Sequence, residues 1–207
     1  ISLMIEIIYY SRTAPTSGSY IGENLQESGR IDIAIHTVIA AFFLSHKIRT
    51  DVKLHLCFAG PPDPPKHLEI MPVTEGKTGV DKIYLAKTNV SIILKKMLYK
   101  FKEGEKREVF PGVSVERKGF IELIKDYVKE GRNVYILDPD GEDIRTAEIG
   151  KDPVFVLGDH RGLPLKEMKR IKKICTPLTV GKRTYFASQA LAILNNEIDR
   201  REDLGLM

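Results

Sequence analysis

Val154-Phe-Val-Leu-Gly-Asp-His-Arg-Gly162 is the stretch of sequence that most strongly indicates the fold. Its apolar start is typical of a strand buried in a parallel sheet, and its two glycines permit a tight turn into a following helix. Two further predicted strands, ending at Leu137 and Val180, are also followed by glycine-containing loops. Because ligands of open parallel sheets bind beyond the carboxyl ends of the strands, the three loops could converge on one cofactor. A tight turn between a strand and a helix explains the same glycines equally well.

Strands and helices alternate along the rest of the chain. Hydrophobic spacing and turn residues predict helices over Arg30–His46, Thr88–Phe101, Phe120–Glu130, Leu163–Lys173 and Tyr185–Asp199. Strands are predicted in a first segment ending near Tyr10 and over Val52–Ala59, His67–Met71, Lys82–Ala86, Asn133–Leu137, Pro153–Leu157 and Ile174–Val180. The pattern predicts an α/β fold with a mostly parallel sheet flanked by helices.

The length and composition are those of a single globular domain. At 207 residues, the chain is expected to form one unit over residues 1–207. Apolar residues make up 43% of the chain and charged residues 29%, which excludes disordered and fibrous classes. The net charge is only +4, so any contact with nucleic acid must come from local clusters such as Lys95–Arg107 and Lys166–Lys173. For both clusters a solvated helix face is the alternative explanation.

Neither a membrane span, a disulfide nor a metal site is expected. The longest apolar run, Val38–Leu44, is far shorter than the roughly 20 residues of a spanning helix. Cys57 and Cys175 lack CxxC spacing, which argues against a disulfide framework and a zinc site and favours a reducing, cytoplasmic environment. The five histidines are scattered, with no paired-ligand spacing, so no metal is predicted.

Common nucleotide and hydrolase motifs are missing. Gly76-Lys-Thr78 looks like the end of a P-loop, but Met71 occupies the position where that motif requires a glycine. The sequence contains neither the GxGxxG dinucleotide fingerprint nor the GxSxG nucleophile elbow. Classical dinucleotide binding and the usual hydrolase mechanisms therefore lack support.

Several longer motifs occur in a characteristic order. The earlier ones are Gly29-Arg-Ile-Asp32, Ala40-Ala-Phe-Phe-Leu-Ser-His46 and Ile48-Arg-Thr-Asp51, and the later ones are Asn133-Val-Tyr-Ile-Leu137, Gly141-Glu-Asp143, Pro153-Val-Phe-Val-Leu-Gly-Asp-His160 and Gly162. In these residues, and over nearly its whole length, the chain resembles the archaeal tRNA pseudouridine N1-methyltransferases, which belong to the SPOUT class.

The resemblance implies a fold and a cofactor. The C-terminal part, about residues 133–200, is expected to form a trefoil knot, an exception to the rule that chains avoid knots. S-adenosylmethionine is expected to bind in this knot, and a homodimer is expected with the knot at its interface. The positions that match the cofactor loops are Leu137, Leu157, Gly158, Gly162, Thr179, Val180, Gly181, Lys182, Arg183, Thr184, Tyr185 and Ala190.

The implied reaction is methylation of N1 of the pseudouridine at position 54, in the T-arm of tRNA. N1 must lose its proton while negative charge develops on the base, so a carboxylate and an arginine are the side chains such a reaction can use. We hypothesise that Asp32 accepts the proton and that Arg30 stabilises the charge. The alternatives are that Asp32 caps its helix and that Arg30 pairs with a phosphate or a neighbouring acid.

Two further predictions concern the basic side chains that could contact tRNA and a position at which the sequence departs from the family. The candidates for phosphate contacts with tRNA are Arg12, Arg30, Arg49, Arg161, Lys182 and Arg183. Ala190 stands where many family members carry a cysteine, so cysteine-dependent chemistry is not expected. Two alternatives stay open: methylation of a pseudouridine in ribosomal RNA, and a non-catalytic RNA-binding module that retains the knot.

Overall fold

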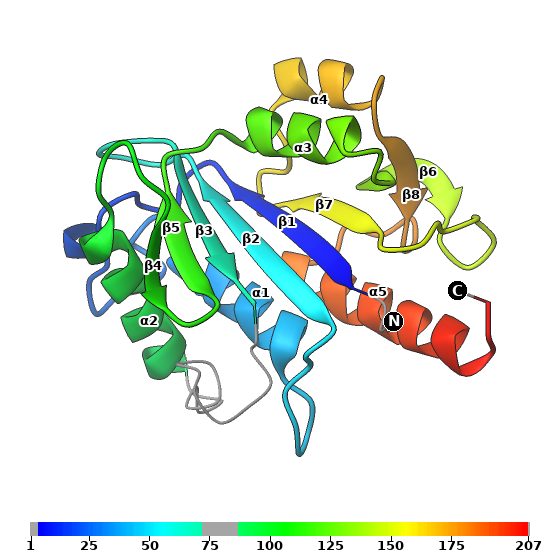
Figure 1. Ribbon diagram of the computed structural model, residues 1–207, viewed down its shortest axis with the longest axis horizontal. Coiled ribbons are helices and arrows are strands. Elements are labelled where there is room, and N and C mark those ends of the chain that lie inside the picture. The colour runs from blue at the N-terminus through cyan, green and yellow to red at the C-terminus, as the bar shows by residue number, and fades with distance from the viewer. Residues whose placement is uncertain (1–3, 72–86, 207) are drawn as a thin grey trace.

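The computed structural model describes residues 4–71 and 87–206, which form an eight-stranded sheet with helices on both faces (Figure 1). The strands are β1 (Ile5–Ser11), β2 (Val52–Phe58), β3 (Lys66–Ile70), β4 (Arg107–Phe110), β5 (Val113–Glu116), β6 (Val134–Asp143), β7 (Val154–Gly158) and β8 (Thr176–Thr179). The helices are α1 (Ile31–Phe42), α2 (Lys87–Lys100), α3 (Phe120–Lys129), α4 (Leu165–Ile171) and α5 (Ala187–Asp203), with a short 3-10 helix η1 (Gly18–Tyr20). The predicted α/β class is confirmed.

The sheet is mixed, with a parallel half and an antiparallel half. Its strand order is β4-β5-β3-β2-β1-β7-β6-β8, and every pairing from β2 to β8 is parallel. Strands β3, β5 and β4 extend the β2 edge by antiparallel pairing. The prediction of a mostly parallel sheet therefore describes only the half that runs from β2 to β8.

The hairpin of β4 and β5 is the element that sequence patterns did not predict. Strand β4 lies at the edge of the sheet and is at most half-buried, so it lacks a clear apolar alternation. Between the two strands Gly112 has a φ of 74°, in the left-handed region that glycine enters without steric cost. The strand expected over Lys82–Ala86 lies outside the described residues.

The core has two layers, one on each face of the sheet. Helices α1, α2 and α5 cover one face, and α3 and α4 cover the other (Figure 1). Strand β1 separates the layers: Ile5 and Ile7 belong to the first, and Ile8 and Tyr10 to the second. This division follows from the strand period of two, which sends successive side chains to opposite faces.

Helix α1 is shorter than the sequence predicts. It begins at Ile31, one residue after the predicted start at Arg30, and ends at Phe42 rather than near His46. The backbone turns extended at Phe43, which pairs with Ile48 across a tight loop. This pairing brings the chain back into strand β2.

Strand β6 is longer than predicted and changes register beside β8. It continues past Leu137 as far as Asp143, and both Leu137 and Glu142 pair with Leu178 of β8. Gly141 allows this close approach, because a Cβ atom there would lie 2.6 Å from the Leu178 backbone. The β6 segment therefore bends around β8 at the place where the first predicted loop begins.

The structure also bears on the expectations that the chain has no membrane-spanning helix and no disulfide. None of the helices in residues 4–71 and 87–206 is both long and apolar enough to cross a membrane. Cys57 and Cys175 are buried free thiols, so they form no disulfide with each other. Burial raises the pKa of Cys175 to about 12, which keeps this thiol protonated at neutral pH.

Candidate functional site

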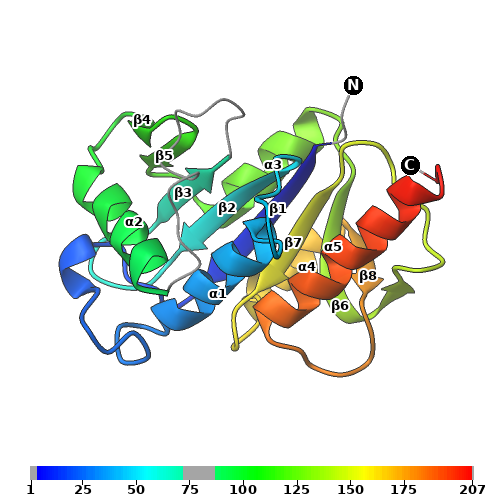
Figure 2. The same cartoon turned by 90° about the horizontal axis from the view of Figure 1, so that it is seen from below.

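A pocket of about 160 Å³ lies at the carboxyl ends of β6, β7 and β8. Figure 2 shows the loops that follow β7 and β8 along the same edge of the sheet as the beginnings of α1 and α5. The pocket is lined by Leu137, Asp138, Pro139, Leu157, Gly158, Gly162, Thr179, Val180, Gly181, Arg183, Thr184, Tyr185, Ala187 and Ala190. All three predicted loops therefore meet at one place.

Most of the residues predicted to bind the cofactor line this pocket. Of that set, only Lys182 is absent from the lining, and its side chain is exposed. The pocket adds Asp138, Pro139 and Ala187, which sequence reasoning did not select. Asp138 directly follows Leu137, where the strand was predicted to end, and this position is the signal that could have identified it as a pocket residue. Binding of a cofactor by these residues stays a prediction.

The second loop is shaped by backbone contacts that only glycine allows. A Cβ atom at Gly158 would lie 2.7 Å from the carbonyl carbon of Gly162, and Gly162 itself has a φ of 65°. The Asp159 carboxylate accepts hydrogen bonds from the Ser11 hydroxyl at 2.8 Å and from the Arg161 amide at 2.8 Å. The loop is therefore anchored to the end of β1 and leaves room for a ligand close to its backbone.

The first and third loops are held in the same manner. The Thr179 hydroxyl accepts a hydrogen bond from the Gly181 amide at 3.0 Å and donates one to the Gly181 carbonyl at 2.9 Å. Burial would raise the pKa of Asp138, but hydrogen bonds from Lys172 and the Asp140 amide outweigh burial and lower it. Asp138 therefore stays ionised, and its carboxylate stabilises the first loop through its contacts with Lys172 and the Asp140 amide.

The lining suits a small molecule with a flat apolar part and several polar atoms. Leu137, Leu157, Val180 and Ala187 offer apolar surface, and the glycine loops offer backbone N–H and C=O groups. Ligand sites of small molecules generally combine a mostly apolar wall with a few convergent polar groups. The adenine and amino-acid parts of S-adenosylmethionine fit this chemistry.

Arg30 and Asp32 form a close ion pair at the start of α1. Arg30 donates from Nε and Nη2 to the two carboxylate oxygens of Asp32, at 3.0 Å and 3.1 Å. The hydrogen bond to Asp32 is the largest cause of the raised pKa of Arg30. Arg30 occupies the N-cap position of α1, and Asp32 lies in the first turn, so of the alternatives for this pair the structure shows the pairing of Arg30 with a neighbouring acid.

The pair lies near the same edge of the sheet as the pocket. Gly29, which precedes Arg30, accepts a hydrogen bond from Thr13 at 2.9 Å in the loop after β1. Tyr9 of β1 pairs with Leu157, which lines the pocket. Burial raises the pKa of Tyr9, and the carboxylates of Asp159 and Asp32 raise it further, which places both acids within electrostatic reach of this phenol.

The candidate phosphate contacts differ in accessibility. Arg12, Arg161, Lys182 and Arg183 have exposed side chains on or beside the pocket loops. Arg49 is only 6% exposed and donates hydrogen bonds to Asp199 at 2.8 Å and Asp51 at 2.7 Å. This burial argues against the prediction that Arg49 contacts RNA, because its guanidinium joins the segment before β2 to α5.

The overall fold resembles that of a solved structure. Nep1 from Archaeoglobus fulgidus, solved with S-adenosylhomocysteine, superposes with a TM-score of 0.64 at 11% identity, covering 97% of this chain and 99% of that chain. At this level of identity the likeness establishes the fold alone. The chain is therefore an α/β protein with the Nep1 fold and with a pocket at the carboxyl ends of its parallel strands.

Sequence comparison identifies the family. Residues 4–203 match the family model described as "Putative SAM-dependent RNA methyltransferase". The tRNA (pseudouridine(54)-N(1))-methyltransferase of Methanocaldococcus jannaschii is 32% identical over 206 residues, covering 96% of this chain and 98% of that protein. The enzyme of the same name from Thermococcus kodakarensis is 33% identical over 201 residues, covering 95% and 99%. The chain belongs to this family of S-adenosylmethionine-dependent RNA methyltransferases, together with the archaeal tRNA pseudouridine N1-methyltransferases.

Proposed function

We propose that the protein methylates N1 of pseudouridine 54 in the T-arm of tRNA, with S-adenosylmethionine as methyl donor. The observation that carries the proposal is the full-length similarity to relatives that bear this name, combined with the pocket formed by the three matching loops. This reading is favoured over a ribosomal RNA substrate, because the similar curated archaeal proteins are named for tRNA. A tRNA-modifying enzyme of this kind acts in the cytoplasm.

The chain's own residues have two tasks in this reaction. The pocket loops would hold the cofactor, since they offer apolar side chains for an adenine and backbone N–H and C=O groups for polar atoms. When bound, S-adenosylmethionine supplies an electrophilic methyl group. Asp32 accepts the proton that N1 loses, and Arg30 offsets the negative charge on the base. Because the donor is already reactive, alignment of the two reactants is the main contribution of the protein.

We further propose that the C-terminal part, about residues 133–200, forms a trefoil knot within a single domain spanning residues 1–207. The bend of β6 around Leu178 supports the knot, since residues on both sides of Gly141 pair with the same position of β8. A homodimer with the knot at its interface is supported by apolar side chains exposed beside the pocket, including Tyr185 at 38% and Phe186 at 60% exposure.

The T-arm of tRNA would reach the pocket past exposed basic side chains. Arg12 and Arg161 flank the second loop, where their backbone amides both bond Asp159. Lys182 and Arg183 belong to the third loop and are also exposed. These four side chains can neutralise phosphates around a base that is presented to the pocket.

Incubation of the protein and S-adenosylmethionine with T-arm RNA, followed by nucleoside mass spectrometry, tests the proposal. We expect N1-methylpseudouridine from RNA that contains pseudouridine at position 54 and no product from the matched RNA that contains uridine. Preferential methylation of a ribosomal RNA fragment would replace the tRNA reading. The alternative of a non-catalytic RNA-binding module rests on Ala190, which stands where many family members carry a cysteine. If calorimetry detects no cofactor binding at millimolar concentration, this alternative replaces the proposed enzyme.

A further inference from the structure

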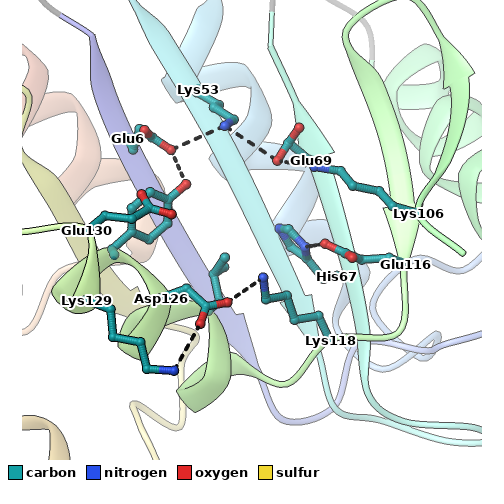
Figure 3. Close-up of a pocket in the computed structure, with 12 residues that line it drawn as sticks. Glu6, Lys53, His67, Glu69, Lys106, Glu116, Lys118, Asp126, Lys129 and Glu130 are labelled. Atoms are coloured by element: carbon teal, nitrogen blue, oxygen red, sulfur yellow. Dashed lines mark hydrogen bonds and ion pairs between the residues drawn. The ribbon is translucent and has the colours of Figure 1, made fainter. Parts of the chain in front are cut away.

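A second cavity, of about 400 Å³, opens between α3 and the strands β2, β3 and β5 (Figure 3). It shares no lining residue with the pocket at the ends of β6, β7 and β8. Charged and titratable side chains dominate its walls, among them Glu6, His67, Glu69, Lys106 and Glu116. The methyl-transfer reaction uses none of these residues.

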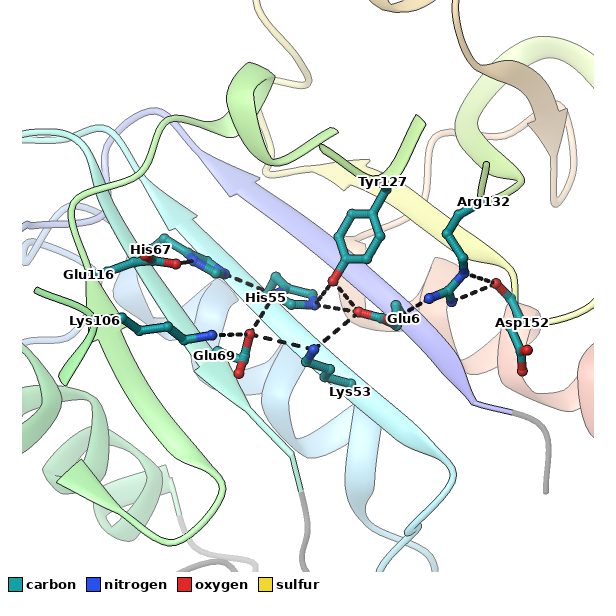
Figure 4. A network of polar contacts seen from close by, with 10 residues as sticks. All are labelled: Glu6, Lys53, His55, His67, Glu69, Lys106, Glu116, Tyr127, Arg132 and Asp152. Atoms are coloured by element: carbon teal, nitrogen blue, oxygen red, sulfur yellow. Dashed lines mark hydrogen bonds and ion pairs between the residues drawn. The ribbon is translucent and has the colours of Figure 1, made fainter. Parts of the chain in front are cut away.

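Two buried histidines face each other beside this cavity (Figure 4). His55 is 0% and His67 is 1% exposed, and Nδ1 of His55 lies 2.8 Å from Nε2 of His67. The other ring nitrogen of His55 lies 3.0 Å from Glu6. The other ring nitrogen of His67 lies 2.9 Å from Glu116. Each imidazole therefore lies between a carboxylate and the second imidazole.

The two carboxylates determine where the imidazole protons lie. An ionised carboxylate only accepts hydrogen bonds, so each outer ring nitrogen carries the N–H. The Glu6 carboxylate also accepts a hydrogen bond from the Tyr127 hydroxyl and one from the Arg132 guanidinium at 2.8 Å, as an ionised carboxylate does. The two nitrogens that face each other, Nδ1 of His55 and Nε2 of His67, are the inner nitrogens. If both rings are neutral, each inner nitrogen presents a lone pair to the other at 2.8 Å. Two acceptors at this distance repel each other unless they share a cation, either a proton on the line between them or a metal ion beside that line, about 2.0 Å from each nitrogen.

Glu69 supplies a third possible ligand at the same place. It lies directly opposite His55 in the antiparallel register of β2 and β3. Its Oε2 atom lies 3.8 Å from Nδ1 of His55. One ring nitrogen of each histidine and one oxygen of Glu69 all lie within 4.8 Å of one another, close enough to be ligands of one ion.

We propose that His55, His67 and Glu69 bind a divalent transition-metal ion of the zinc type. Two imidazoles and one carboxylate form the donor set of open zinc sites, in which water takes the fourth position. The adjoining cavity gives that position access to solvent. Glu6 and Glu116 orient the two rings, as outer carboxylates do for metal-bound histidines. The site is separate from the proposed methyl transfer, and it reverses the expectation that histidine spacing excludes a metal.

Two lysines compete with a metal for Glu69. Lys106 donates a hydrogen bond to Oε2 of Glu69 at 2.9 Å, and the Lys53 ammonium lies 3.6 Å from the same atom. The Lys106 side chain is 45% exposed, so its ammonium can move into solvent when Glu69 turns to a metal ion. Removal of the Lys106 charge should therefore strengthen metal binding.

Calorimetric titration of the full-length, chelator-treated protein with Zn²⁺ tests the proposal. We expect one Zn²⁺ per chain, and with Co²⁺ the intense visible absorption of a four-coordinate site. Glu69→Gln should weaken zinc binding about tenfold or more, as loss of a carboxylate at a metal site does. Lys106→Met should strengthen zinc binding. Both side chains reach solvent, so these variants test the site without removing a fully buried histidine.

Glu202→Gln is the matched control. It removes a carboxylate from a second group, with Asp51 and Asp199, whose oxygens also lie within 4.8 Å of one another. We expect its zinc affinity to equal that of the unmodified protein. Absence of stoichiometric zinc binding, or equal affinity of the unmodified protein and Glu69→Gln, overturns the proposal and leaves a shared proton as the cation between the two rings.

Discussion

Arg30 holds Asp32 by two hydrogen bonds, of 3.0 Å and 3.1 Å, that reach both oxygens of the carboxylate. Arg30 achieves this with a φ of 58°, in the left-handed region that side-chain-bearing residues rarely adopt. Such a conformation costs on the order of 1 kcal/mol and persists where the surrounding structure enforces it. The pair is therefore preorganised at the edge of the sheet where the three pocket loops meet.

We expect Asp32→Asn and Arg30→Ala each to slow methyl transfer by about 100-fold, the usual contribution of a positioned proton acceptor or charge partner. Affinity for S-adenosylhomocysteine should change little, because neither residue lines the pocket. Single-turnover assays with pseudouridine-containing T-arm RNA, with calorimetry in parallel, measure the two quantities.

Arg145→Ala is the matched control, because Arg145 pairs with Asp143 at the same sequence spacing, at 3.2 Å on an exposed surface. Its turnover should equal that of the unmodified protein. Near-normal turnover in both Asp32→Asn and Arg30→Ala would remove this pair from the mechanism.

Gly158→Ala should weaken S-adenosylhomocysteine binding by at least about tenfold, or about 1.4 kcal/mol. The added Cβ would lie 2.7 Å from the Gly162 carbonyl carbon, so the second loop must shift away from its present path. Calorimetry measures the affinity. Gly119→Ala is the control, since the nearest atom to its Cβ is 4.0 Å away, at Glu122. Unchanged affinity in Gly158→Ala would mean that the cofactor binds elsewhere.

Removal of a phosphate contact should appear in the salt dependence of tRNA binding. Arg161→Ala and Arg183→Ala are each expected to reduce the slope of log K against log salt by about one. Lys129→Ala serves as control, because its 78% exposed side chain lies on α3, away from the pocket loops. Binding titrations over a range of salt concentrations give the slopes, and equal slopes in all variants would contradict the proposed RNA path.

Arg49→Ala should lower the free energy of unfolding without changing the salt slope. The variant loses hydrogen bonds to Asp51 and Asp199 between charged partners, which are worth about 1–3 kcal/mol. Urea denaturation measures the loss. A reduced salt slope in a variant with undiminished stability would return Arg49 to the RNA-contacting set.

Glu197 should make stability depend on pH. Hydrogen bonds from Arg200, and further from Arg201, lower the pKa of Glu197 to about 2, below the 4.5 of an unperturbed glutamate. Because the folded pKa is the lower one, the stabilisation is complete above about pH 4.5 and is lost as the pH falls toward 2. Urea denaturation should therefore show Glu197→Gln less stable than the unmodified protein at about pH 7, with the difference narrowing at about pH 3. A difference that is constant across this range would contradict the assignment.

The glycine-containing loops after the strands are the part of the site that local sequence patterns predicted. An apolar run followed by glycine predicted the ends of β7 and β8, and the family motifs selected eleven of the residues that line the pocket. Glycine at these positions reports a local backbone requirement, which any sequence reading can detect. By contrast, β4 of the β4–β5 hairpin carries no apolar alternation, because this edge strand is paired on one side only.

Arg49 and the two histidines show what local pattern cannot reach. A basic residue beside a loop has the same sequence signature whether it faces solvent or, as Arg49 does, two aspartates from distant elements. His55 and His67 lie in different strands and share no spacing motif along the chain, and only the antiparallel pairing of β2 and β3 brings their rings together.

The sequence by itself therefore determined the α/β class, the order of most elements, the family and the residues of the three loops. These features depend on residues close together in the chain or on long motifs in a constant order. Tertiary structure alone decided the mixed sheet, the burial of Arg49, the bend of β6 around Leu178 and the meeting of the two histidines. Each of these depends on which distant segments pair, a choice made by the packing of the whole chain and recorded in no single stretch of it.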